Sequence, residues 1–236
     1  MKINKILNIQ QPYELKTYKD KIIVKVWDWE YSRFLETLKN INLYISQNPS
    51  KQIYLFCSHS ACLTNGQGLE KSKGKIKDDL VEFTNDHLLD FPTVFKVKRG
   101  GGLTFHHGGQ LNFYPIFHLT HQKKNLQTYM LRLLKYCAQS LNDLLETNDF
   151  HYKGPFLGLW HHDNKVGSIG MGLERYVTQH GYSLNFFNNP EFITQIKKCY
   201  PCGINLENYK SVNELYTIDS RFRQSFIEKF LSKIFE

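Results

Sequence analysis

Residues 99–110 read Arg-Gly-Gly-Gly-Leu-Thr-Phe-His-His-Gly-Gly-Gln, a stretch that contains five glycines. Glycine adopts backbone conformations closed to other residues and lets another group approach the chain closely. We therefore expect an irregular segment here rather than a helix or strand. Arg99 and the two histidines add polar groups, which favours a binding loop over the alternative of a turn with a surface arginine. A Walker loop is excluded because its Gly-Lys-Ser/Thr ending is absent, and so is the dinucleotide-binding spacing.

Strands and helices are predicted on both sides of this loop. Apolar runs predict strands at 21–26, 53–56, 94–98, 111–117, 156–160, 165–169 and 182–186. Helical spacing of apolar residues predicts helices at 31–45, at about 125–146, and from an Asp219 or Ser220 cap onward. Residues 57–75 are predicted to form a long loop, and Pro115 indicates an edge strand or a bulge. This order predicts one α/β or α+β domain over residues 1–236.

Composition narrows the class of protein. Of 236 residues, 41% are hydrophobic and 22% charged, as is usual for a globular chain. No apolar run is long enough to span a bilayer and the N-terminus lacks a signal-peptide core, so we expect a cytoplasmic protein without a membrane partner. The net charge of +8 suits an acidic protein partner or merely reflects a lysine-rich composition. The lysines are scattered and no nucleic-acid motif is found, so no nucleic-acid partner is expected.

Two further clusters contain reactive side chains. Cys202 lies between Pro201 and Gly203, where a turn would expose its thiol, and a nearby ammonium would favour the nucleophilic thiolate. Lys165 enters a predicted strand followed by small residues and could reach into a cleft, although most lysines are simply solvated. The number of cysteines is odd, so a disulfide framework is not expected. Cys137 lies on the apolar stripe of the helix at 125–146, which predicts a buried structural thiol.

Together these clusters resemble the lipoyl(octanoyl) transferases, also called the LipB family. Residues 99–106 are similar to that family's Arg-Gly-Gly-x-x-Thr-aromatic-His motif, and Gln110-Leu111 follows as in the family. Residues 165–170 resemble its Lys-Ile-Ala-Ser-Ile-Gly segment. His180-Gly181 with Asn185 resembles its His-Gly-x-x-x-Asn, and residues 201–203 resemble its Pro-Cys-Gly. The motifs follow in the family's order across residues 94–205.

The resemblance implies a mixed sheet flanked by helices, as in the biotin and lipoate protein ligases. It implies ping-pong acyl transfer from octanoyl-acyl carrier protein, with Cys202 as the nucleophile and Lys165 as its acid/base partner. The acceptors would be lipoyl domains of 2-oxoacid dehydrogenase E2 subunits and the glycine cleavage H protein. No cofactor and no metal ion is expected. The implied substrate-binding residues are Arg99, Gly100, Gly101, Gly102, Leu103, Thr104, Phe105, His106, Ser168, Ile169, Gly170, His180, Gly181, Tyr182 and Ser183.

Some features depart from the family or suit other functions. His107-Gly108 replaces the usual Gly-Pro, and residues 57–66 recover only part of the family's Glu-His-Pro-Pro and Thr-Leu-Gly segments. Cys199 and Cys202 could form a redox pair, and with Cys57 and Cys62 a zinc site, but both are less favoured readings. The main alternative is an ATP-dependent lipoate- or biotin-protein ligase, which does not need the Pro-Cys-Gly nucleophile. A noncatalytic binding protein is the third class, and intact Lys165 and Cys202 argue against it.

Overall fold

The computed structural model describes residues 3–67, 94–153, 157–195 and 206–235, and its largest element is an eight-stranded sheet. In spatial order the strands are β1 (Tyr13–Tyr18), β2 (Lys21–Trp29), β3 (Gln52–His59), β7 (Gln110–Phe117), β11 (Val177–Asn185), β10 (Asn164–Glu174), β9 (Gly158–His161) and β8 (Phe150–Lys153). The β2–β3 pair is parallel, and the other neighbours are antiparallel. The sheet is therefore mixed, as the resemblance implied.

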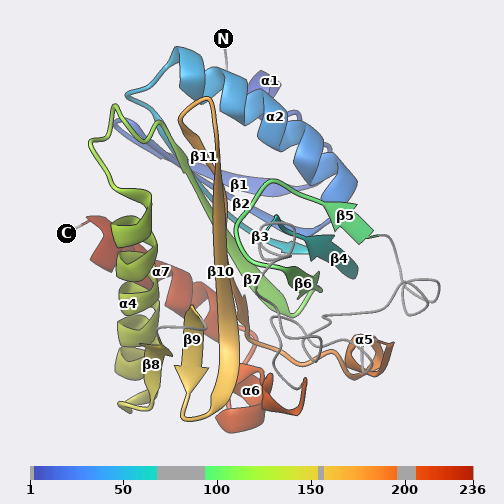
Figure 1. Cartoon of the computed structure of the whole chain (residues 1–236). Helices are drawn as coiled ribbons and strands as arrows, with labels where there is room; N and C mark the ends of the chain where they lie inside the picture. Colours follow the sequence, from blue (N-terminus) through green and yellow to red (C-terminus); the bar gives the residue numbers. More distant parts are fainter. Residues whose placement is uncertain (1–2, 68–93, 154–156, 196–205, 236) are drawn as a thin grey trace, which may run out of the picture.

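Helices cover both faces of this sheet (Figure 1). On one face lie α1 (Ile3–Leu7) and α2 (Tyr31–Gln47), and on the other lie α4 (Leu126–Leu145) and α7 (Phe222–Phe235). Alternate residues of β3 separate the two cores: Leu55 packs with the α1–α2 side, whereas its neighbour Phe56 packs with the α4–α7 side. This alternation follows from the two-residue period of a strand. The predicted mixed sheet flanked by helices is confirmed.

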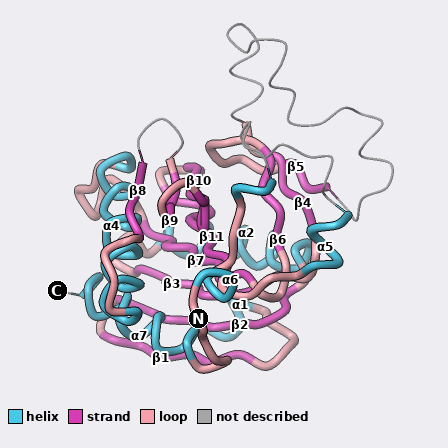
Figure 2. Tube along the Cα trace, turned by 90° about the horizontal axis from the view of Figure 1, so that it is seen from below, coloured by secondary structure: helices cyan, strands magenta, loops and turns pink. Residues whose placement is uncertain are grey.

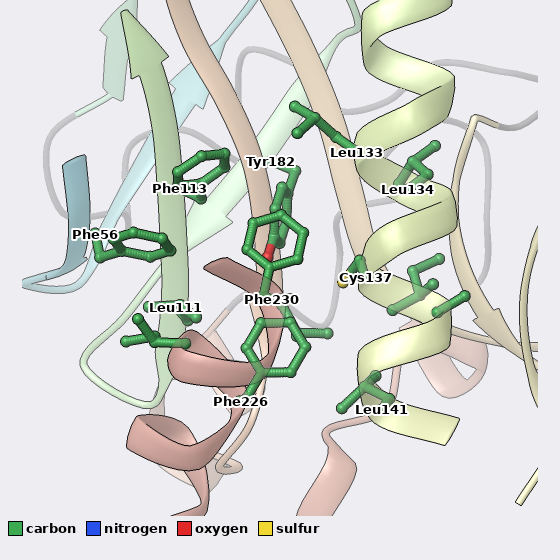
Figure 3. Close-up of a cluster of buried hydrophobic side chains, with 14 of the residues drawn as sticks. Phe56, Leu111, Phe113, Leu133, Leu134, Cys137, Leu141, Tyr182, Phe226 and Phe230 are labelled. Carbon is green, nitrogen blue, oxygen red and sulfur yellow. The ribbon is translucent and has the colours of Figure 1, made fainter. Parts of the chain in front are cut away.

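The predicted helix at 125–146 is confirmed as α4. Asn125 caps its start, because the Asn125 Oδ1 accepts a hydrogen bond from the Thr128 amide at 3.0 Å. Figure 3 shows the apolar stripe of α4 facing β7 and β11, with Phe226 and Phe230 of α7 completing the cluster. Cys137 lies on this stripe and is fully buried, which confirms its structural position.

A second, three-stranded sheet corrects two predictions. It contains β5 (Val94–Lys96), β4 (Cys62–Asn65) and β6 (Leu103–His106), in the order β5-β4-β6 (Figure 2). Residues 57–75 are therefore not one loop, since β3 continues to His59 and β4 follows. Residues 99–110 also contain a regular strand, because β4 pairs with β6 from Cys62↔His106 to Asn65↔Leu103. The glycines flank this strand instead of interrupting it.

The prediction that Pro115 marks an edge strand or a bulge is wrong, because β7 lies between β3 and β11 and its register with β3 is continuous through Tyr54↔Pro115. The ladder to β11 pairs only Phe113↔Tyr182 through Gln110↔Asn185, so it does not include Pro115 and does not require the amide that proline lacks. Beyond this ladder, the Thr178 hydroxyl donates to the Pro115 carbonyl at 2.6 Å and accepts from the Phe117 amide at 3.0 Å.

Short helices complete the C-terminal part: α5 (Pro190–Gln195), η3 (Leu206–Asn208) and α6 (Val212–Leu215). Tyr209 forms an isolated parallel bridge with Lys165, and the Lys210 amide donates to the Lys165 carbonyl at 3.0 Å. The C-terminal segment is therefore attached to the start of β10. Asp219 accepts a hydrogen bond from the Arg221 amide at 2.9 Å just before α7, near the predicted cap. Among the described helices, none has the length and apolar character to cross a membrane.

Candidate active site

A cavity of about 300 Å³ opens among three of the sequence clusters. Its volume is at the lower end of the range for small-molecule sites. The lining comes from α2, the loop before β6, β6, β7, α4, β10 and β11. It consists of Tyr31, Arg99, Gly100, Gly101, Gly102, Thr104, His106, Asn112, Tyr114, Met130, Leu157, Lys165, Ser168, Ile169, Gly170, Met171, His180, Gly181, Tyr182 and Ser183. Segments far apart in sequence are thus brought together, although this alone assigns no role to any of them.

Two predicted residues, Leu103 and Phe105, lie outside this lining. Both are buried and border a second, much smaller cavity of about 10 Å³ with Tyr209 and Asn185. Alternation along β6 explains the difference, because Thr104 and His106 point toward the large cavity from the opposite side of the strand.

The glycine-rich loop lies directly on β10. The Gly100 amide donates to the Met171 carbonyl at 3.0 Å. A Cβ atom on Gly170 would lie 2.6 Å from the Gly100 carbonyl oxygen, and one on Gly172 would lie 1.9 Å from the Lys98 carbonyl oxygen. Only glycine permits this approach of two backbones. The spacing of Gly170 and Gly172, which places both on one face of a strand, is a sequence signal that could have predicted the contact.

Arg99 is the first residue of the glycine-rich loop and has only 7% of its surface exposed. Its Nη2 donates to the Thr64 carbonyl at 3.0 Å, the Thr64 hydroxyl at 2.8 Å and the Thr104 hydroxyl at 2.8 Å. Its Nη1 donates to the Gly100 carbonyl at 3.0 Å. These four acceptors are neutral oxygens, so they orient the guanidinium without cancelling its charge.

A buried row of polar side chains continues from Thr64 through His106. The His106 Nδ1 faces the Gln110 Oε1 at 2.7 Å and the Asn112 Oδ1 at 3.1 Å, so we assign the ring proton to Nδ1. The Nε2 then accepts from the Thr64 hydroxyl at 3.2 Å. The Gln110 Nε2 donates to the Asn185 Oδ1 at 2.9 Å. The row joins β4, β6, β7 and β11 into one fixed wall.

The histidines around this wall are neutral at physiological pH. Burial lowers the pKa of His180 to about 3, with a further contribution from the charge of Arg99. Burial, and then repulsion from His59, lowers the pKa of His106 well below its usual range. His59 itself has its pKa lowered to about 4 by burial, and its Nε2 lies 3.0 Å from the Tyr114 hydroxyl. These imidazoles therefore act as hydrogen-bonding groups and not as cations.

Lys165 is the second residue of β10 and is 1% exposed. Its Nζ lies 5.8 Å from the centre of the Trp160 ring and 5.6 Å from that of Tyr209. Both distances are within the range of cation–π contact. The predicted strand lysine that reaches into a cleft is therefore observed as a buried amino group at the cavity.

Gly158 of β9 makes room for the Lys165 side chain. A Cβ atom at Gly158 would lie 2.7 Å from the Lys165 Cε and 2.6 Å from the Gly167 carbonyl oxygen. The aliphatic part of Lys165 thus crosses β9 where no side chain is present. The β9–β10 register also shifts between Lys165 and Gly167, which indicates a bulge at this point.

The residues that give the cavity its apolar side and its buried amide were not predicted from the sequence. Met130, Leu157 and Met171 line the cavity together with the predicted Ile169 and Tyr182. Met130 and Leu157 belong to segments without a reactive motif, so no local signal identified them.

Asn112 also lines the cavity and was missed. It is fully buried, and its Nδ2 has no hydrogen-bond partner among the described residues. A buried asparagine in the apolar run Leu-Asn-Phe-Tyr is unusual and could have been noticed. The Asn112 amide is thus a buried donor beside the cavity that lacks an acceptor among the described residues.

Cys199 and Cys202 lie outside the described residues. The described cysteines are Cys57, Cys62 and Cys137, and all three are buried. Burial raises the pKa of Cys62 and Cys137 to about 12 and that of Cys57 well above its usual range. None of these three thiols is therefore suited to act as a thiolate nucleophile.

Comparison with solved structures shows which fold this chain shares. The fold matches lipoate-protein ligase A bound with ATP, with a TM-score of 0.63 at 12% identity over 89% of this chain and 85% of the other. It also matches a bi-partite lipoate protein ligase from Thermoplasma acidophilum, with a TM-score of 0.58 at 14% identity over 89% and 82%. At such low identity these matches establish the fold and nothing more.

Sequence relatives then define the family. The model of the lipoyl protein ligase A/B catalytic domain matches residues 36–235. An octanoyltransferase of Prochlorococcus marinus strain MIT 9312 is 32% identical over 202 residues, which cover 86% of this chain and 82% of the relative. The chain therefore belongs to the lipoyl protein ligase A/B catalytic-domain family, on its octanoyltransferase branch. The predicted family resemblance is confirmed.

Other relatives share less of their length with this chain. The octanoyltransferase of Prochlorococcus marinus strain NATL2A is 36% identical over 167 residues, which are 70% of this chain and 64% of that protein. That of strain NATL1A is 37% identical over 167 residues, which are 71% of this chain and 62% of that protein. The chain thus matches less than two thirds of the length of these two relatives. All three relatives bear the name of an acyl-transferring enzyme.

Proposed function

We propose that this chain is an octanoyltransferase that moves an octanoyl group from octanoyl-acyl carrier protein to a lysine of a lipoyl domain. The observation that carries the proposal is the buried amino group of Lys165, which lies at a cavity lined by the motif segments 99–102, 168–170 and 180–183. The names of the curated relatives support the same chemistry.

In the first half-reaction the Cys202 thiolate attacks the thioester carbon of the donor. A tetrahedral oxyanion forms, and its collapse expels the thiolate of the carrier protein, which takes up a proton. Cys202 then holds the octanoyl group as a thioester. The buried Lys165, acting as an ammonium, would stabilise the Cys202 thiolate and supply the proton to the leaving thiol.

In the second half-reaction the amine of the acceptor lysine attacks the Cys202 thioester. The new amide bond forms as the C–S bond breaks, and the excess proton passes from the amine to Lys165. This returns Lys165 to its ammonium form and Cys202 to its thiolate. No nucleotide, metal ion or redox cofactor enters this balance. The acceptors would be lipoyl domains of 2-oxoacid dehydrogenase E2 subunits and the glycine cleavage H protein, in the cytoplasm.

The two sides of the cavity suit such a substrate. Met130, Leu157, Ile169 and Met171 offer an apolar surface for the acyl chain. The polar side carries the Asn112 Nδ2, which could donate to the thioester or its oxyanion. Arg99 adds a fixed positive charge, which favours developing negative charge. An acidic carrier protein also suits the net charge of +8.

Intact-mass spectrometry after mixing with octanoyl-acyl carrier protein, without ATP, tests the proposal. We expect one octanoyl adduct per chain, and peptide mapping should place it on Cys202. Cys202→Ala should abolish the adduct, whereas the matched control Cys199→Ser should retain it. An adduct that persists in Cys202→Ala would contradict the nucleophile assignment. Modification that requires ATP and free octanoate would instead support a ligase with the fold of the structural neighbours.

A further inference from the structure

A cluster of metal-ligating side chains lies away from the cavity, where β9 turns into β10 (Figure 1). It consists of Asp149, His161 and His162. The Nε2 atoms of His161 and His162 each lie 3.8 Å from a carboxylate oxygen of Asp149. One ligand atom from each residue falls within 4.8 Å of the others. None of the three residues lines the cavity, so the acyl-transfer proposal gives them no role.

The backbone explains why two consecutive histidines face one carboxylate. Successive side chains of a strand point to opposite faces, so neighbours in β9 would diverge. His161 ends β9, and His162 follows with a φ of 51°, in the left-handed region. This turn brings the second imidazole back beside the first, and the two ring centres lie 4.5 Å apart. Asp149 immediately precedes Phe150, which pairs directly with His161 across β8 and β9.

Further contacts hold the carboxylate in position. The Thr147 hydroxyl lies 2.7 Å and the Tyr216 hydroxyl 2.9 Å from the Asp149 Oδ2. These two hydrogen bonds fix the carboxylate, as outer contacts do around metal ligands. Asp149 thus presents a fixed carboxylate to both imidazoles, and carboxylate and imidazole are ligand types that bind transition metal ions.

We propose that Asp149, His161 and His162 form a binding site for a divalent first-row transition metal ion, with Zn²⁺ as the best match. Two imidazoles and a carboxylate suit zinc, cobalt, nickel or copper, whereas magnesium and calcium prefer oxygen ligands alone. Ligand atoms on a tetrahedral zinc ion are separated by about 3.4 Å, since each lies about 2.1 Å from the metal. The 3.8 Å spacings to the two oxygens of Asp149 are close to this value, whereas the wider spacings within the set, up to 4.8 Å, would have to contract when an ion binds.

The position of the site indicates a structural effect on the hairpin. The side chain of His162 is 66% exposed, so an ion can reach it from solvent and complete its coordination with water. The hydroxyl of Tyr216, which follows α6, donates to the Asp149 Oδ2 at 2.9 Å, whereas its 3.2 Å contact with the His161 Nε2 would be replaced by the ion. The ion would thus fasten the β9–β10 turn to the start of β8 and to the segment after α6. Lys165 lies three residues beyond His162, so the same turn begins the strand that positions it.

The test is a titration of the full chain, after removal of any purification tag, with Zn²⁺ followed by calorimetry and with Co²⁺ followed by absorption. We expect saturable binding of one ion at this cluster. His162→Ala and Asp149→Asn should each weaken binding by at least about tenfold, the scale already seen when only an outer contact of a metal ligand is lost. His121→Ala, which removes an exposed histidine elsewhere, is the matched control and should bind as the wild type does.

Cysteine ligation would give a different result, which makes the proposal falsifiable. Histidine and carboxylate ligands give Co²⁺ only weak visible absorption, whereas thiolate ligands add intense sulphur-to-cobalt charge transfer in the near ultraviolet. The proposal is overturned if no saturable binding occurs, if His162→Ala and Asp149→Asn bind as tightly as His121→Ala, or if the cobalt spectrum is that of a thiolate complex. Because no acyl substrate is involved, these outcomes are independent of the proposed octanoyl transfer.

Discussion

At the scale of single residues, Lys165 combines two properties that rarely occur together. It is 1% exposed, yet its amino group is of the kind that usually remains in water. The rings of Trp160 and Tyr209 lie near its Nζ, and Gly158 leaves room for its aliphatic chain. Burying an amino group costs free energy, which makes Lys165 a candidate for the acid/base role proposed above.

We expect Lys165→Ala to lower octanoyl transfer by a factor of about 10² or more, which is the usual effect of losing acid–base assistance. The pH profile of Cys202 alkylation should also move to higher pH, since the positive charge that favours the thiolate is lost. Stopped-flow alkylation with iodoacetamide across pH 5–10 measures this profile. Lys39→Ala, on the exposed surface of α2, is the control and should change neither quantity. An alkylation profile unchanged by Lys165→Ala would remove Lys165 from the mechanism.

At the scale of elements, the contact between the glycine-rich loop and β10 is the structural feature that shapes the cavity. Gly172 lies under the Lys98 carbonyl, and an added Cβ would meet that oxygen at 1.9 Å. A Cβ added at Gly100 would lie 3.6 Å from the Met171 carbonyl oxygen, which is an ordinary van der Waals contact. An added methyl group should therefore fit at Gly100 but clash at Gly172, although both glycines lie in the same interface.

Gly172→Ala should therefore lower the free energy of unfolding by about 1–3 kcal/mol, the usual cost of overpacking. Gly100→Ala should change it by less than about 0.5 kcal/mol, as expected where no special contact is lost. Urea unfolding followed by tryptophan fluorescence compares the two variants. Equal stability of both variants would show that the loop does not rest on β10 in the way the structure describes.

The sequence predicted elements well where one periodic signal was long. The helices at 31–45 and 125–146 were found because each has a continuous apolar stripe, and they correspond to α2 and α4. Strand β1 was missed because five of its six residues are polar or aromatic and four of its side chains are exposed, as in an edge strand. Strand β6 was missed because its neighbouring glycines dominated the local pattern, while its hydrogen bonds come from distant β4.

The candidate site was predictable to a similar extent and for a related reason. Family-like motifs identified the loop before β6 and the cavity-facing parts of β10 and β11. Motifs could not identify Tyr31 or Met130, which reach the cavity from helices on opposite faces of the sheet. Such residues are selected by the packing of α2 and α4 and leave no local signal. The position of Pro115 in a central strand was unpredictable because the end of the β7–β11 ladder at Phe113 is set by a strand distant in sequence.

At the scale of the whole molecule, buried histidines connect the two sheets. His59 ends β3, His106 ends β6 and His180 lies in β11, and the rings of His59 and His106 are 5.5 Å apart. Tyr31 of α2 packs against both, with ring centres 4.8 Å from His59 and 5.4 Å from His106. Protonating any of these rings would place a charge inside the packed core, close to the fixed charge of Arg99.

Lowering the pH should therefore lower the free energy of unfolding already at pH values well above those at which carboxylates titrate. In the unfolded chain histidine has a pKa of about 6.5, whereas burial lowers it to about 4 in His59 and His107 and to about 3 in His180. Between these values the unfolded state binds more protons than the folded state. Stability is thus fully present above about pH 6.5 and falls as the pH decreases toward about 4, by up to about 1.4 kcal/mol per pH unit for each histidine.

Urea unfolding at intervals from pH 8 to pH 4.5 measures this dependence. One substitution tests how much of the dependence comes from His180. His180 has a φ of 58°, a conformation that asparagine tolerates better than most residues, so His180→Asn keeps the backbone while removing the titrating ring. We expect this variant to lose stability less steeply below pH 6.5, by up to about 1.4 kcal/mol per pH unit, because it lacks one imidazole that takes up a proton on unfolding. His121→Ala, which removes an exposed histidine, should leave the slope unchanged. A free energy of unfolding that stays constant between pH 6.5 and pH 5 would contradict the burial of neutral histidines at the centre of this fold.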